Sequence, residues 1–191
     1  MSLHETRRVS TDAKRYIVDA IDGVADIGAA IAKAVSHCLE HAVRSVPADG
    51  AGTMGAVTET IAGAAYGVAD VFGEVGDDSR YIMLGAMKGA SRVGLADMET
   101  VSTCAEEITR STVRLGGDPG ISARGAVEGA IAAAEAIGVS SEEAAFAAGT
   151  GVIRAAREIG PHAVNRVTRE LSRAIPGLSA GFALPWSRAA G

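Results

Sequence analysis

The stretch GAMKGA at residues 85–90 returns as GAVEGA at residues 125–130, and a looser version, GAAYGV, occupies residues 63–68. Each copy places two small residues four positions apart, which puts them on one face of a helix. Without bulky side chains between them, two helix axes can approach more closely than the usual separation of roughly 8–10 Å. An internal Gly weakens a helix by about 1 kcal/mol relative to Ala, so the pattern indicates a packing role.

The segments that carry these small residues belong to a repeat with an offset of 22 residues. Repeat units begin at residues 19, 41, 63, 85 and 107 and, after an 18-residue step, at 125 and 147. The fifth position of the unit is always small: Gly23, Ser45, Gly67, Gly89, Ser111, Gly129 and Gly151. Such repeats bury their apolar faces by stacking on one another. We expect close helix contacts at Gly23, Gly67, Gly85, Gly89, Gly125, Gly129 and Gly151.

Several segments predict where helices begin and end. AEAIG at residues 134–138 and REIG at residues 157–160 place Ile before a Gly, as at a helix C-terminus where the Gly takes a positive φ. Ser140 and Glu143 have the spacing of a capping box. Pro161 suits the first position of a helix. The chain is therefore expected to reverse direction repeatedly.

These signals define an all-α fold, because no segment shows the alternation expected of a strand. The predicted helices lie near residues 10–46, 53–74, 79–115, 121–137, 140–159 and 161–174. We predict an antiparallel helical bundle or stack built from degenerate 22-residue Gly/Ala repeats. The expected organisation is a flexible N-terminus at 1–9, a helical repeat domain at 10–175 and a Pro- and Gly-containing tail at 176–191.

The composition limits how such a domain can be stabilised. Of 191 residues, 48% are hydrophobic, but only three Phe, three Tyr and one Trp are present, so Ala supplies much of the apolar mass. At about 25 cal/mol per Å² of buried area, an Ala-rich core is weak. Stability must come from close helix approach, from a partner, or from both.

We find no sequence pattern of a signal peptide or of a membrane-spanning helix. The N-terminal residues lack the apolar stretch of a signal peptide, and no 18-residue window has the uncharged character of a membrane-spanning helix. The two cysteines fit a reducing compartment. We expect a cytoplasmic protein, in peripheral contact with a membrane or granule surface as an alternative. Nucleic acid is not an expected partner, since the net charge is -5 and no aromatic residue interrupts the arginines near residues 154–173.

The segments GAVEGAIAAAEAIG (125–138) and GVIRAAREIG (151–160) resemble the units of uncharacterised bacterial proteins built from Gly/Ala-rich helical repeats of the GAI-x-AA-x-EIG type. The resemblance is clearest over residues 120–170. It implies a helical repeat and brings no reaction or cofactor with it. In build, the chain is also similar to small Ala-rich scaffold subunits that hold redox enzymes together or near a membrane, such as those that accompany some aerobic hydrogenases.

A polar cluster, SHCLEH at residues 36–41, offers a different interpretation. Cys38 and Cys104 lie three repeat periods apart, and the same shift aligns His41 with Glu107. These four residues would make a plausible tetrahedral zinc set if the repeat brought them together. Alternatively, the thiols are small buried hydrophobes and the histidines are solvated.

No catalytic motif is present: the sequence contains no nucleophile elbow, phosphate-binding loop, dinucleotide fingerprint or zinc-protease signature. We therefore predict a non-enzymatic, self-associating scaffold or adaptor without a cofactor, which packs through its Gly/Ala faces and forms homo-oligomers. It would engage a protein partner, such as a redox enzyme complex, or a hydrophobic surface. The tail residues expected to bind that partner are Phe182, Leu184 and Trp186. The alternatives are a metal-binding or redox bundle that uses Cys38, His41 and Cys104, and a protein of lipid or granule surfaces.

Overall fold

The computed structural model describes residues 3–21, 26–47 and 50–174, which form eight α-helices and one short 3-10 turn, with no strand among them. The helices are α1 (Leu3–Ile21), α2 (Ile27–Arg44), α3 (Gly50–Phe72), α4 (Ser79–Arg92), α5 (Met98–Arg114), α6 (Pro119–Ile137), α7 (Ser141–Ile159) and α8 (Pro161–Ala174). The 3-10 turn η1 (Gly76–Asp78) precedes α4. The predicted all-α fold is confirmed.

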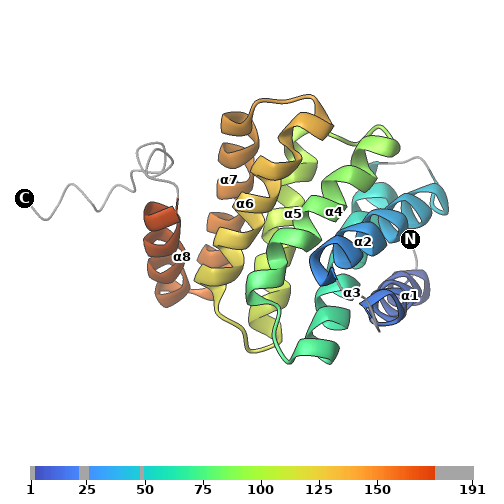
Figure 1. The fold of residues 1–191 in the computed structure, drawn as a ribbon, viewed down its shortest axis with the longest axis horizontal. Coiled ribbons are helices and arrows are strands. Elements are labelled where there is room, and N and C mark those ends of the chain that lie inside the picture. The colour runs from blue at the N-terminus through green and yellow to red at the C-terminus, as the bar shows by residue number, and fades with distance from the viewer. Residues whose placement is uncertain (1–2, 22–25, 48–49, 175–191) are drawn as a thin grey trace, which may run out of the picture.

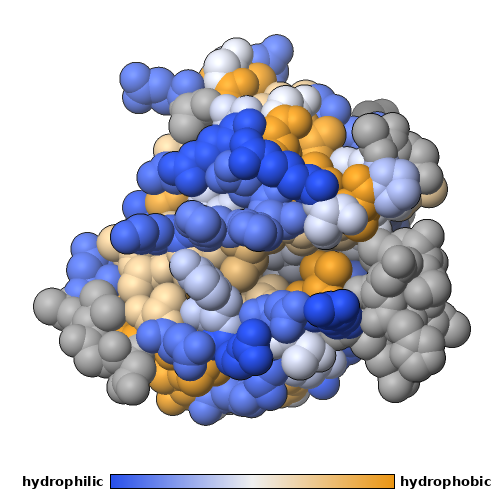
Figure 2. Space-filling model, turned by 90° about the vertical axis from the view of Figure 1, so that its right-hand side faces the viewer, coloured by the Kyte–Doolittle hydropathy of each residue, from blue (hydrophilic) through white to orange (hydrophobic). Residues whose placement is uncertain are grey.

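The helices form two layers. Each helix packs against its neighbour in sequence and against the helix two places away, so that α1, α3, α5 and α7 make one layer and α2, α4, α6 and α8 the other. Figure 1 shows the resulting stack, which runs from α1 and α2 at one end to α8 at the other. Figure 2 looks onto the end formed by α1 and α2.

The small pairs lie where helices of one layer meet. A Cβ atom added to Gly67 of α3 would be 2.9 Å from the carbonyl oxygen of Lys14 on α1, and one added to Gly89 of α4 would be 2.7 Å from that of Ser36 on α2. Real Cβ atoms essentially never come that close. The same relation joins α6 to α4 and α7 to α5, through Gly129 and Gly151 respectively.

The 22-residue offset therefore advances the chain by one helix, and the small pair of a helix faces the helix two places earlier. Six of the seven expected contact glycines have this environment, while Gly23 lies outside the described residues. All six are buried within the chain. The Gly/Ala faces are thus filled by helix contacts within the chain, and the expected self-association stays a prediction.

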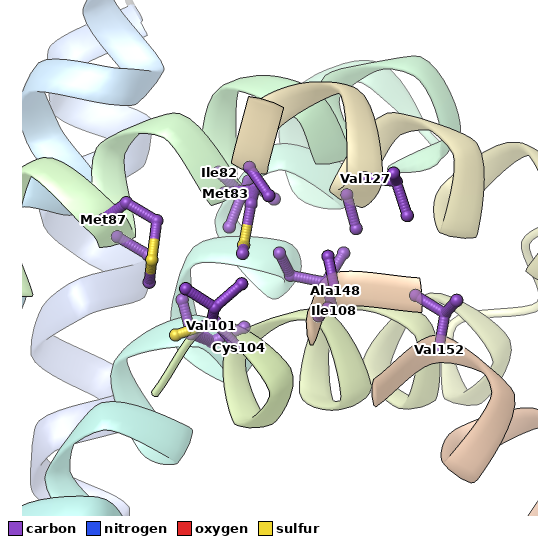
Figure 3. Packing of buried hydrophobic residues seen from close by; sticks show 14 of the residues in the cluster. Ile82, Met83, Met87, Val101, Cys104, Ile108, Val127, Ala148 and Val152 are labelled. Carbon is purple, nitrogen blue, oxygen red and sulfur yellow. The ribbon is translucent and has the colours of Figure 1, made fainter. Parts of the chain in front are cut away.

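The interior is rich in Ala, with a small number of larger side chains. Figure 3 shows Ile82 and Met83 of α4 and Val127 of α6 above Cys104 and Ile108 of α5. All five are fully buried. Because Ala contributes little area, close backbone contact at the glycines compensates by bringing more atoms within van der Waals distance.

Two of the long helices that the sequence predicts are each divided into two helices in the structure. The expected helix at 79–115 ends at Arg92, where Gly94 takes φ +75° and the amide of Leu95 donates to the carbonyl of Ala90 at 2.9 Å. Asp97 then caps α5 by accepting from the amide of Thr100 at 2.8 Å. The Gly and the Asp are ordinary stop and start signals.

The expected helix at 10–46 is likewise divided into α1 and α2, and residues 22–25 lie outside the residues that the structure describes. Asp26 caps α2 by accepting from the amide of Ala29 at 3.0 Å. In addition, α1 begins at Leu3, so most of the segment 1–9 is helical rather than flexible. Its helix-favouring Glu and Arg residues extend a helix that is anchored further along.

The expected helix ends between α6 and α8 are found in the structure. Gly138 ends α6 with φ +72°. Ser140 and Glu143 form a reciprocal capping box at the start of α7, and Pro161 begins α8. These local signals depend on neighbouring residues alone, which is why the sequence predicts them well.

Candidate binding groove at the α1–α2 end

A groove of about 920 Å³ lies at the free end of the stack, between α1 and α2. Half of its lining residues come from α1, and the other half come from the second half of α2 and the turn that follows it. In Figure 2, bands of hydrophilic residues border paler and apolar surface on this end of the molecule. The groove is a candidate binding site.

Aromatic rings form a row along the groove. Tyr16 of α1 stacks on His37 of α2 with 6.1 Å between ring centroids, and His37 stacks on His41 at 6.4 Å. Tyr16 is 48% exposed. The next residue, Ile17, packs into the core, and Leu39 does the same between the two histidines. These core contacts turn Tyr16 and the histidines toward the groove.

Charged residues of α1 surround the row of rings. Arg8, Asp12, Arg15 and Asp19 all line the groove. Asp12 and Arg15 approach each other to 3.7 Å, but their side chains are 58% and 76% exposed, so the ion pair is weak. Both signs of charge are therefore presented to whatever occupies this end.

Cys38 also lines the groove. Burial raises the pKa of its thiol to about 11, with a further contribution from the carboxylate of Asp12. The thiol is therefore protonated at neutral pH and is a poor nucleophile. Cys104 lies in the core, where burial, followed by the charge of Asp97, raises the pKa of its thiol to about 12.

The predicted zinc set of Cys38, His41, Cys104 and Glu107 is not assembled, and this prediction is wrong. A shift of three periods is a shift of three helices, which takes α2 in one layer to α5 in the other. Within the described ranges, no group of three or more His, Cys, Asp or Glu residues is placed to hold a metal ion. The tail residues Phe182, Leu184 and Trp186, predicted to bind a partner, lie outside the described residues.

Glu107 has a different environment from the one expected. It is 2% exposed and accepts hydrogen bonds from Arg110 at 2.8 Å, from Ser111 at 2.8 Å and from Arg114 at 3.2 Å. Burial raises the pKa of the nearby Glu59 carboxyl, and the charge of Glu107 adds to this effect. A buried acid with this many donors is a structural element of the α5 helix.

An ion network joins α5 to α7. Arg110 bonds to Glu106 on its own helix and to Glu158 on α7 at 2.7 Å, and Arg154 reaches Glu106 at 2.9 Å. Burial alone would lower the pKa of Arg110, but hydrogen bonds to Glu158, Glu107 and Glu106 raise it overall. The signal in the sequence was the four-residue spacing of Glu106 and Arg110.

Comparisons with known proteins identify the class of the fold. No protein-family model matches the chain, and no curated protein matches it in sequence. A crystal structure of a de novo designed helical repeat protein, DHR7, is similar, with a TM-score of 0.54 and 19% identity over 97% of this chain and 99% of that one. The chain is therefore a helical repeat in architecture. In the described part of the chain, no helix is long and apolar enough to span a membrane.

Proposed function

We propose that the protein is a non-enzymatic helical scaffold that self-associates and holds a protein partner. The observation that carries this proposal is the open groove at the α1–α2 end. α4 meets α2 through Gly85 and Gly89, and the positions two repeat periods earlier are His41 on α2 and Ser45 at its C-terminal cap. Both residues line the groove. The face that other helices use for stacking is thus open on α2.

The chemistry of the groove favours binding over catalysis. Its rings offer flat apolar area with polar edges, which is the composition of protein interaction sites. Its thiol is protonated at neutral pH, and its carboxylates lie on an exposed helix face beside arginines. Such a groove suits a segment of another protein, such as a subunit of a redox enzyme complex.

Self-association is tested by light scattering at micromolar concentration. We expect a mass of two or more chains, and a monomer at every concentration would contradict this part of the proposal.

Partner binding is tested by immobilising the protein and comparing the proteins that it retains from a native extract. We expect the double variant His37→Ala/His41→Ala to lose proteins that the original chain retains, because the variant removes two rings of the groove. The matched control is His162→Ala, which changes an exposed histidine at the start of α8. Equal retention by the double variant and the original chain would contradict the groove as the binding site.

A further inference from the structure

We propose that a second copy of the chain docks on α1, with the two α1 helices antiparallel around a two-fold axis. This inference rests on the self-association proposed above and names its surface. It concerns the face of α1 that points away from the core and forms one wall of the groove.

Four charges of alternating sign lie on that face. Arg8, Asp12, Arg15 and Asp19 follow one another at steps of four, three and four residues, which keeps them on one side of a helix. All four are exposed. The opposite side of α1 carries Ala13, Ile17 and Ile21, which are buried.

The order of the charges is self-complementary in one antiparallel register. In an antiparallel pair, a step up one helix corresponds to an equal step down the other. Arg8 to Asp12 is a step of four residues, and Asp19 back to Arg15 is also a step of four. The register that places Arg8 opposite the partner's Asp19 therefore also places Asp12 opposite the partner's Arg15. The two-fold axis repeats both pairs, giving four ion pairs.

Other arrangements of the same two helices lack this match. A parallel pair in register would place each charge against its own kind, which is unfavourable. A two-fold contact is also the commonest way in which identical chains associate. The charges therefore select both the partner, which is another copy of this chain, and its orientation.

The ion pairs would set the geometry, and neighbouring groups would supply contact area. Exposed ion pairs individually contribute little to affinity, whereas they strongly affect register and the choice of partner. Tyr16 lies one residue from Arg15 and is half exposed, and Val9 lies next to Arg8 at the groove. Both would lose water on contact with the partner's α1.

The test uses two charge-reversal variants with opposite stripes, studied by analytical ultracentrifugation. Arg8→Glu/Arg15→Glu makes the stripe entirely acidic, and Asp12→Lys/Asp19→Lys makes it entirely basic. We expect each variant alone to dimerise at least tenfold more weakly than the original chain, because like charges meet. An equimolar mixture of the two should form a 1:1 heterodimer, and that heterodimer should weaken as salt is raised.

The matched control is Lys88→Glu/Arg157→Glu, which changes net charge as much as the acidic variant does, at exposed positions away from α1. It should dimerise like the original chain. Circular dichroism should show unchanged helix content in all variants, since only exposed side chains are altered.

Three results would overturn the inference, and they differ in what they imply. A monomeric original chain would remove the proposed self-association together with this surface. If the acidic variant dimerises as tightly as the original chain, self-association would be retained and α1 would be rejected as its surface. Two monomeric variants that stay monomeric on mixing would reject the antiparallel register.

Discussion

The contacts of α5 with its two neighbours in the layer differ in kind. Against α7, the backbone of α5 meets Gly151 so closely that a Cβ atom added there would fall 2.9 Å from the carbonyl carbon of Ser102. Toward α3, the positions of the small pair on α5 are Glu107 and Ser111, and α5 packs less closely on α3 than on α7. The α5–α7 contact is a contact between helix backbones, whereas the α5–α3 contact contains a buried carboxylate.

This difference shows what the repeat specifies. Where the unit keeps its glycine, two helices touch along their backbones. Where Glu107 replaces the first small residue, the helix must bury a carboxylate, and α5 provides Arg110, Arg114 and Ser111 to satisfy it. At this position the repeat accommodates a large buried residue whose hydrogen-bond partners come from the same helix.

The largest effect is expected from Gly151→Leu, which attacks the backbone contact. The new side chain would collide with the backbone of α5 near Ser102, which cannot move as a flexible side chain could. We expect a loss of unfolding free energy of about 3 kcal/mol or more, measured by urea denaturation.

The control is Gly50→Ala at the start of α3, where an added Cβ meets nothing within 4 Å. It should be neutral or stabilise by up to about 1 kcal/mol. A Gly151→Leu variant as stable as this control would show that the α5–α7 contact is not close.

A smaller effect is expected from Glu107→Ala, which attacks the polar contact. Its removal leaves Arg110 and Arg114 without their buried acceptor, although Arg114 is half exposed and can turn to water. We expect a loss of about 2–3 kcal/mol in urea denaturation. The comparison is Glu99→Ala, an exposed acid of the same helix, which should change stability by less than about 0.5 kcal/mol. Equal losses in the two variants would mean that burial of Glu107 has no energetic consequence.

More of the fold than of the groove could be predicted from the sequence. Small residues four apart reveal helix contacts because only side-chain size and helical spacing matter. The break between α4 and α5 was missed because Val93 and Leu95 surround Gly94 with apolar residues that continue the helical pattern. Gly94 and Asp97 are nevertheless local stop and start signals, so this break could have been predicted from the sequence.

The groove depends on a chain reversal that the sequence did not reveal. His37 and His41 share a helix face by spacing alone, so their proximity was predictable. Tyr16 joins them only because α1 and α2 fold back on each other, whereas the sequence predicted one continuous helix at 10–46. The zinc set failed for a related reason: the repeat counts helices along the chain, and equivalent positions on α2 and α5 lie in different layers.

The smallest predicted effect concerns Glu59, which faces the polar contact from α3. Burial and the charge of Glu107 raise the pKa of Glu59 above its ordinary value of 4.5. A raised pKa means that the folded state binds this proton more tightly than the unfolded state does. The contribution of Glu59 to the free energy of unfolding is therefore fully present below pH 4.5, and it is lost as the pH rises through the pKa of the folded state. Glu59→Gln removes that decline. We expect the variant to be slightly more stable than the original chain at pH 7, with no such gain below pH 4.5, when urea midpoints are compared across this range.

Because the repulsion from Glu107 is part of the cause, the gain at pH 7 should shrink when Glu59→Gln is made in the Glu107→Ala background. A gain that is equal in both backgrounds would mean that the two acids on either side of the α3–α5 contact do not interact.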